Sequence, residues 1–226
     1  MRRLLRASST VLIVAGLLMM ADAGVTLAWQ EPVSALVARL AQDRLSGELT
    51  DIEHQQPTAT QRRALASLAS ERRRVAFLAR AARSDATTGE PIGRIRIPSI
   101  HASFVVVQGT DGATLRKGPG HYPDTSFPGL AGTVAIAGHR TTYGAPFRKV
   151  DELKAGQPIV LEMPYGRFTY AIQRTRIVKP TALWVTRDVG YERLVLSACH
   201  PLYSAAERII VFARLRSVAA RGAAEG

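Results

Sequence analysis

The chain has 226 residues, of which 46% are hydrophobic, so it can bury one sizeable core and still carry extensions. Its net charge of +12 favours anionic surroundings, but it has no zinc-finger spacing, helix-turn-helix signal or aromatic-interleaved basic strand, so nucleic acid is not an expected partner. A single cysteine excludes an intramolecular disulfide framework, and without CxxC or HExxH motifs we expect no metal and no cofactor.

Residues 10–29 form an apolar segment in which Asp22 is the one charged residue. About 20 such residues are enough to cross a hydrocarbon core of roughly 30 Å. Three arginines among the first six residues favour a cytoplasmic N-terminus with the rest of the chain outside the cell. We therefore predict that residues 1–30 form a cytoplasmic stub and a single-pass signal anchor in the cytoplasmic membrane. A cleaved signal peptide is the alternative, because Ala21 and Ala23 give the small-x-small form of a cleavage site.

Residues 31–90 are predicted to form an extracytoplasmic helical linker. Apolar spacing indicates a helix over 32–48, which Gly47 should end, and a second helix over 62–83. The second helix carries seven arginines, which suits attraction to anionic wall polymer or lipid headgroups. There are two alternatives for this helix. It could pack across the core and regulate access to it, or it could be a solvated helical spacer.

From residue 91 onward, strand-length apolar runs alternate with turn signals. There are seven or eight such runs, and only residues 146–153 interrupt them with a helical pattern. Because loops separate the runs, rather than helices of about 10 to 15 residues, we predict an all-β fold, an antiparallel barrel or sandwich. The barrel is expected to cover residues 91–218 and to leave a flexible tail at 219–226.

Cys199 ends one of these apolar runs, shortly before Pro201, which cannot donate a hydrogen bond to a strand ladder. A thiol at a strand end can face a cleft, although a free cysteine is also commonly a small buried hydrophobe. A nucleophilic cysteine needs a cation or base beside its thiolate. His200 is poorly placed for this role, because neighbouring strand residues point to opposite faces.

Better partners for Cys199 come from two other runs. His139 ends an apolar strand after small residues that would let a substrate backbone approach. Arg208 opens a strand that would lie antiparallel to the one closed by Cys199, which brings its guanidinium near the sulfur. Taken alone, His139 could be a structural histidine, and Arg208 could form a surface ion pair with Glu207 or Glu192.

The order of these residues resembles the sortases, the cell-wall transpeptidases of Gram-positive bacteria. A Gly-His pair, a Leu-x-x-Cys motif and an arginine nine positions after the cysteine follow an exporting N-terminus. The resemblance extends through IGRIRIPSI, GPGHYPDTSFPG, AGHRTTYGAPF, ACHP and RIIVFARL, and so covers roughly residues 91–216. HRTTYGAPF and CHP are most similar to the class E subgroup, with class D next.

This resemblance implies a sortase-like eight-stranded β-barrel with short helices, preceded by a transmembrane helix and a linker. It implies that Cys199 is the nucleophile, His139 the general acid and base, and Arg208 the cation that binds substrate carbonyls and stabilises the oxyanion. The implied partners are the sorting-signal peptide of exported surface proteins and an amine of a peptidoglycan precursor or pilin. The implied reaction cleaves the Thr-Gly bond of an LPxTG-like or LAxTG-like signal and passes the thioester-bound protein to that amine.

The sequence also departs from the family's pattern. Val195 and Ala198 stand where threonines are usual, and no carboxylate is recognisable as an orienter for His139. A catalytically weak binding or scaffolding module is therefore the alternative function, and a cysteine hydrolase is another. The candidates for lining the substrate groove are Ala198, Tyr143, Leu183, Trp184 and His121.

Overall fold

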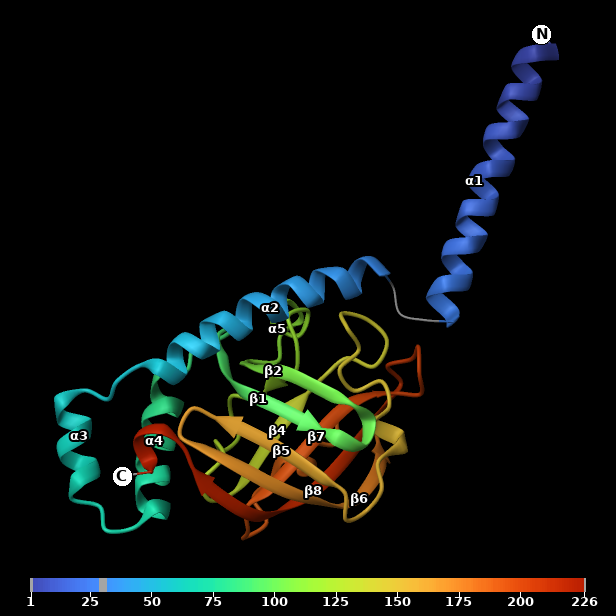
Figure 1. Ribbon diagram of the computed structural model, residues 1–226. Coiled ribbons are helices and arrows are strands. Elements are labelled where there is room, and N and C mark those ends of the chain that lie inside the picture. The colour runs from blue at the N-terminus through green and yellow to red at the C-terminus, as the bar shows by residue number, and fades with distance from the viewer. Residues whose placement is uncertain (1, 29–31, 226) are drawn as a thin grey trace.

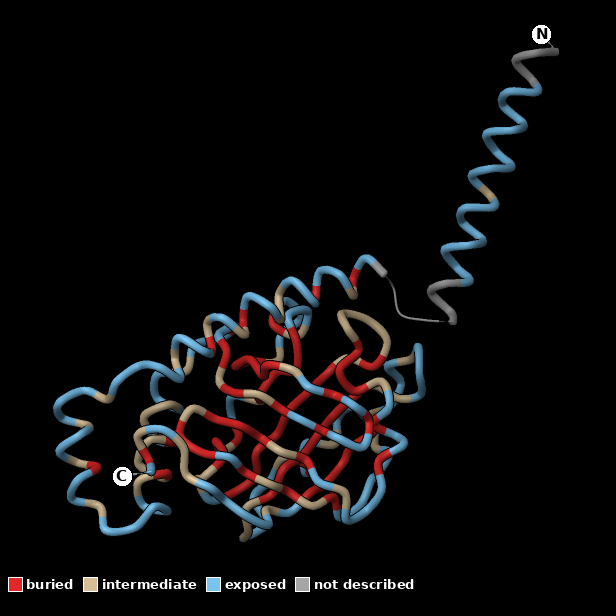
Figure 2. The backbone as a smooth tube through the Cα atoms, in the orientation of Figure 1, coloured by how far each residue is buried: buried red, intermediate tan, exposed pale blue. Residues whose placement is uncertain are grey.

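The computed structural model describes residues 2–28 and 32–225 of the chain (Figure 1). Helix α1, Arg2–Ala28, contains a stretch, Arg6–Gly24, that is long and apolar enough to cross a membrane. The side chains of this stretch are not covered by the rest of the described chain (Figure 2). Trp29, the end of the predicted span, lies outside the described residues.

Eight strands form a closed barrel in the described part of the chain, in the order β1-β2-β3-β4-β7-β8-β6-β5 (Figure 1). This confirms the expected eight-stranded barrel. The strands are β1 Pro91–Ile97, β2 Ala102–Gln108, β3 Gly120–His121, β4 Thr133–Ala137, β5 Pro158–Met163, β6 Gly166–Val178, β7 Arg193–His200 and β8 Glu207–Ala220. The short helical elements are η1 Pro98–Ile100, α5 Gly112–Leu115, η2 Val150–Glu152, η3 Leu183–Thr186 and η4 Gly222–Ala224.

Two neighbouring strand pairs are parallel, which corrects the expectation of an antiparallel barrel. β2 is parallel to β3, and β4 is parallel to β7, with Ala135 opposite Val195 and Ala137 opposite Ser197. Every residue of β4 and most residues of β7 are buried, as is typical of parallel strands covered on both faces. The chain passes from β4 to β7 through the β5–β6 hairpin instead of a helix, so the absence of long helices did not exclude parallel pairing.

Hydrophobic side chains pack on both faces of the wall formed by β4, β7 and β8. The larger cluster fills the barrel interior and includes the fully buried Phe147, Phe168 and Tyr170. A second cluster on the other face of the wall joins Val195 of β7 to Val185 of η3. The segment around η3 therefore covers part of the outside of the barrel.

Helix α2 spans Pro32–His54 and lies across the outside of the barrel (Figure 1). The helix continues through Gly47 to His54, so this glycine does not end it as predicted. An added side chain at Gly47 would contact nothing. Leu45 and Leu49 are buried against Val105 and Val107 of β2. One face of α2 is therefore docked on the barrel through Leu45 and Leu49.

Gln42 fixes the position of α2 on the barrel. Its Nε2 atom donates to the carbonyls of Val105, at 3.1 Å, and Lys117, at 2.8 Å. Its Oε1 atom accepts from the N–H of Val105 at 2.7 Å. One side chain thus pairs both backbone groups of a residue that is fully buried.

The predicted helix over 62–83 is divided into two helices, α3 Ala59–Ala66 and α4 Glu71–Asp85. Ser70 caps the start of α4 by accepting a hydrogen bond from the N–H of Arg73. The N–H of Arg73 also donates to the carbonyl of Ser70 at 3.0 Å, so a new helix begins at Ser70 instead of α3 continuing.

The predicted helix over 146–153 is instead a series of turns that ends in η2. Phe147, Val150 and Leu153 are buried, so the apolar residues recur every three positions. That is the period of a 3₁₀ turn rather than of an α-helix.

The segment over 219–226, expected to be a flexible tail, is packed against the barrel as far as Glu225. The side chain of Ala224 is fully buried within the main core cluster. Arg74 of α4 donates to the carbonyl of Ala224 at 2.8 Å and to that of Glu225 at 3.2 Å. This segment consists mostly of alanine and glycine, so its sequence gave no sign of these contacts.

Replacing Gln42 tests how α2 is held. Gln42→Ala leaves the buried N–H and carbonyl of Val105 without their side-chain partner, which should lower the free energy of unfolding by about 2 kcal/mol. Urea unfolding of the full chain in detergent measures this change. Gln56→Ala is the control, because Gln56 is exposed, and it should leave the unfolding midpoint unchanged. Equal midpoints for both variants would contradict the assigned role of Gln42.

Candidate active site

Cys199 lies near the end of β7, directly opposite Arg208 on the antiparallel strand β8. Both residues are partly exposed. Side chains at directly opposite positions of neighbouring antiparallel strands share one face, with Cβ atoms about 4.5 to 5.5 Å apart. The expected proximity of the thiol and the guanidinium is therefore built into the strand register.

His139 reaches the same end of the barrel through the parallel pairing of β4 with β7. Ala137 is opposite Ser197, and the N–H of Gly138 donates to the carbonyl of Ser197 at 3.0 Å. His139 and Cys199 thus each follow a paired position by two residues along neighbouring parallel chains. A Cβ atom at Gly138 would come within 2.5 Å of the Phe147 ring, so a side chain there would displace this register.

The imidazole of His139 is partly buried beside Tyr143, with ring centroids 5.3 Å apart. The guanidinium of Arg116 lies over the Tyr143 ring at 5.8 Å from its centroid. Burial, and then the positive charge of Arg116, lower the pKa of His139. Its Nε2 atom is inaccessible and has no hydrogen-bond partner among the described residues. At neutral pH the resting imidazole is therefore mostly uncharged.

The guanidinium of Arg208 is held by its own loop. Its Nη1 atom donates to the carbonyls of Ala205 and Glu207, each at 2.9 Å. Within the described residues it forms no ion pair with Glu207 or Glu192, the alternative that the sequence left open. Backbone carbonyls therefore hold the Arg208 side chain, on the strand opposite Cys199.

Arg140 is a component of the site that the sequence analysis missed. Its side chain is 2% exposed and pairs with Asp151 at 2.7 Å. It also donates to the carbonyl of Arg148 at 3.2 Å and to that of Cys199 at 3.4 Å. Arg140 directly follows His139 and thus connects this segment to the backbone of Cys199. A charged residue three positions after a buried strand was the available signal, but no sequence rule pairs it with Asp151.

Three groove candidates remain on the outside of the barrel. Tyr143 lies beside His139, as described above. Leu183 is 76% exposed and Trp184 is 38% exposed, and the Trp184 ring stacks on Phe212 with ring centroids 6.1 Å apart. Both residues belong to η3, the segment that covers β7 and β8.

A second buried arginine, also missed, fixes the η3 segment. Nη2 of Arg193 donates to the carbonyls of Val185, at 2.9 Å, and Arg187, at 2.7 Å. Its guanidinium lies 5.1 Å from the centre of the Phe212 ring. Burial lowers the pKa of Arg193, and within the described residues no carboxylate pairs with it. Carbonyl dipoles and an aromatic face therefore stabilise this charge.

The structure corrects two groove candidates. The side chain of Ala198 is 4% exposed and belongs to the cluster inside the barrel, on the opposite side of β7 from Cys199. His121 is 1% exposed, with Nδ1 at 2.9 Å from Oε1 of Gln108 and Nε2 at 3.0 Å from the carbonyl of Ser126. Neither side chain can line an external groove.

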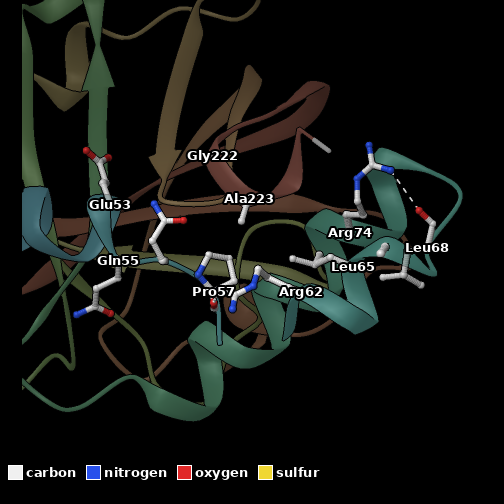
Figure 3. Close-up of a pocket in the computed structure, with 11 residues that line it drawn as sticks. Glu53, Gln55, Pro57, Arg62, Leu65, Leu68, Arg74, Gly222 and Ala223 are labelled. Atoms are coloured by element: carbon white, nitrogen blue, oxygen red, sulfur yellow. Dashed lines mark hydrogen bonds between the residues drawn. The ribbon is translucent and has the colours of Figure 1, made fainter. Parts of the chain in front are cut away.

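A cavity of about 660 Å³ lies between the end of α2, helices α3 and α4, and η4 (Figure 3). Arg62 and Arg74, which line it, donate to backbone carbonyls of this region, those of Pro57 and Leu68. None of the predicted catalytic residues lines this cavity. It is therefore separate from the candidate active site.

Comparison with known sequences matches residues 95–216 to the family model described as the sortase domain. Sortase D of Bacillus subtilis (strain 168) is 37% identical over 131 residues, which are 56% of this chain and 65% of that protein. Sortase SrtE1 of Streptomyces coelicolor is 27% identical over 143 residues, which are 56% of this chain and 41% of that protein. The chain thus spans less than two thirds of the length of these curated relatives.

Comparison with solved structures also finds similarity to sortases. Sortase E from Streptomyces avermitilis is similar over 59% of this chain and 93% of that one, with 34% identity and a TM-score of 0.55. A Clostridium perfringens sortase D5 transpeptidase is similar over 78% of this chain and 99% of that one, with a TM-score of 0.63. At 22% identity, the second similarity shows the fold alone.

The burial of His121 predicts how stability depends on pH. Burial lowers the pKa of His121 to about 4, against an ordinary value of 6.5. The unfolded chain therefore binds a proton first as the pH falls. The stabilisation from the neutral ring is complete above pH 6.5, and about 3 kcal/mol of it is lost between pH 6.5 and 4.

Urea midpoints measured from pH 7 to 4 test this dependence. His121→Gln should lose less stability than the original chain over this interval, by about the same 3 kcal/mol. His54→Gln, a change at an exposed histidine, should follow the original chain. Parallel curves for the original chain and His121→Gln would show that His121 is not buried in its neutral form.

Proposed function

The chain belongs to the sortase family, and on this basis we propose that it is a membrane-anchored cysteine transpeptidase. Its substrate would be an exported protein with an LPxTG-like or LAxTG-like sorting signal. Its second substrate would be an amine of a peptidoglycan precursor or pilin. The observation that carries this proposal is the strand register, which brings Cys199, Arg208 and the end of the His139 strand to one end of the barrel.

Cys199 acts as the nucleophile in the proposed reaction. Its sulfur attacks the carbonyl carbon of the Thr-Gly bond, and the C–N bond breaks to leave a thioester. His139, as imidazolium, gives its proton to the departing amine. The incoming amine then attacks the thioester carbon, returns a proton to His139 and releases the Cys199 sulfur.

Arg208 stabilises the oxyanion that forms at each attack. Its Nη1 atom is occupied by the carbonyls of Ala205 and Glu207, which hold the side chain in place. The N–H groups on Nε and Nη2 then serve the substrate oxygen. One such donor contributes on the order of 3 kcal/mol to a transition state of this type.

The apolar part of α1, Arg6–Gly24, is proposed to anchor the enzyme in the cytoplasmic membrane. The positive charges that precede it favour an N-terminus inside and a barrel outside. In this arrangement the catalytic domain meets exported substrates. A signal peptide removed near Ala21 would release the same domain instead.

A second candidate function, a sortase-like binding or scaffolding module, is favoured by the state of His139. Its Nε2 atom lacks a partner among the described residues, and burial opposes the charged form that catalysis needs. A thiol-reactive electrophile distinguishes the two functions. An activated Cys199 reacts faster than a free thiol in solution, whereas an inert one does not.

Cys199→Ala tests the proposed chemistry. With a sorting-signal peptide, the original chain should accumulate a covalent adduct at Cys199, detected by intact-mass measurement, and should form a conjugate when an amine is added. Cys199→Ala should form neither product while its circular dichroism stays unchanged. Peptide cleavage by Cys199→Ala would refute the assignment, and release of free acid alone in the presence of amine would indicate a hydrolase.

The pH dependence of kcat/KM tests the role of His139. The active form holds one proton between Cys199 and His139, so a second proton at low pH abolishes attack. Since burial and Arg116 lower the pKa of His139, the acid limb should have its midpoint below pH 6.5.

Removing the positive charge with Arg116→Gln should move this midpoint to higher pH. Lys117→Gln removes a neighbouring positive charge that does not act on His139, and it should leave the acid limb in place. An acid limb that Arg116→Gln does not move would show that His139 does not control it.

A further inference from the structure

Helix α2 exposes an apolar stripe on the side that faces away from the barrel. Val33 is 75% exposed, Leu36 59%, Val37 52% and Leu40 62%. Their spacing of i, i+3, i+4 and i+7 places all four on one face of the helix. Four large apolar side chains in two consecutive turns form a contiguous surface, which isolated exposed residues do not.

The opposite face of α2 is the one that packs on the barrel. Ser34 and Ala38 are buried in the same two turns, and Leu45 and Leu49 continue this face along the helix. At 3.6 residues per turn, these positions lie roughly half a turn from the exposed stripe. The stripe therefore remains uncovered because the barrel occupies the other side of the helix.

The stripe is confined to the half of α2 that is nearest to α1. Beyond Leu40, the same face continues through Arg44, Gly47 and Asp51, which are all exposed. The surface thus changes from apolar to polar with distance from α1. The apolar part of this face is therefore the part that lies nearest to α1 along the chain.

The connection to α1 keeps the stripe close to the membrane. Pro32 follows Ala28, the last residue of α1, by four positions, and four residues of extended chain reach about 14 Å at most. If α1 crosses the hydrocarbon core, the first turns of α2 must lie within that distance of its end. Apolar side chains at this depth are buried in the boundary between headgroups and acyl chains.

We propose that Val33, Leu36, Val37 and Leu40 form a docking surface by which α2 lies in the outer interface of the lipid bilayer. The proposal rests on the membrane anchor assigned to α1 above. Arg39, which is exposed on α2, reaches the headgroups with its long side chain. A second copy of the chain is a poorer occupant, because a stable protein interface needs about 20 to 30 residues a side.

The docked turns of α2 also contact the loop that follows His139. The Oγ atom of Ser34 accepts a hydrogen bond from the N–H of Tyr143 at 3.2 Å. Ala38 is buried close to Gly144, where an added Cβ would lie 3.5 Å from the Ala38 side chain. One helix would therefore place this loop at a fixed height above the bilayer.

Spin labels on the full chain test this surface. Cys199 is the only cysteine, so Cys199→Ala provides a cysteine-free background. In that background Leu36→Cys and Leu40→Cys report on the stripe, Arg44→Cys on the same face beyond it, and Leu17→Cys on α1. Each variant carries a nitroxide and is reconstituted into phosphatidylglycerol and phosphatidylethanolamine vesicles. Power saturation compares contact with oxygen, which partitions into lipid, and with a water-soluble nickel chelate.

Labels at positions 36 and 40 should contact oxygen several-fold more than the chelate, and the label at position 44 should show the reverse preference. Equal chelate contact at positions 36, 40 and 44, with lipid contact at position 17, would overturn this inference alone. Spin-spin broadening at positions 36 and 40 would also overturn it, because it would identify a second copy as the occupant. Chelate contact at position 17 would refute the anchor itself.

Discussion

The parallel pairing of β4 with β7 is the constraint on which the candidate active site depends. Parallel strands end at the same edge of a sheet, so Ala137 and Ser197, which are paired, direct the following residues to one end of the barrel. The antiparallel turn into β8 then adds Arg208 opposite Cys199. Backbone register thus brings the ends of three strands, with His139, Cys199 and Arg208, to one end of the barrel. Gly138 is part of this constraint, since the Phe147 ring occupies the space that a side chain would need.

Arginine guanidinium groups hold the irregular segments around this end of the barrel. Arg193 bonds the carbonyls of the η3 segment, Arg208 bonds those of its own loop, and Arg140 joins the carbonyls of Arg148 and Cys199. Of these three arginines, only Arg140 has a carboxylate partner within the described residues. A planar group with five donors can satisfy several carbonyls at once, which suits loops that lack a regular ladder. A different arginine, Arg116, adds its positive charge to the effect of burial in lowering the pKa of His139.

Much of the fold could be predicted from the sequence, because apolar runs and turn signals are local. The barrel and the pairing of Cys199 with Arg208 follow from such patterns. Parallel pairing between β4 and β7 could not be predicted, because local patterns mark the strands of the intervening hairpin but do not show that the chain returns beside β4 in the same direction. The burial of His121 depends on partners in two segments, Gln108 of β2 and the loop residues Thr125 and Ser126, and a histidine in a turn-rich stretch gives no sign of them. Docking of α2 was similarly hidden, because Gln42, a polar residue, makes the decisive contacts.

The central claim, that His139 and Cys199 meet at one end of the barrel, can be measured by chemical bridging. His139→Cys places a second thiol in a chain that otherwise has only one. Paired chains in a sheet lie about 4.8 Å apart, so the two thiols should be bridged by dibromobimane, which becomes fluorescent only when it joins two sulfurs. The account predicts a fluorescent, singly bridged protein whose proteolytic fragments remain joined through positions 139 and 199. Separate alkylation of both thiols without a bridge would contradict it.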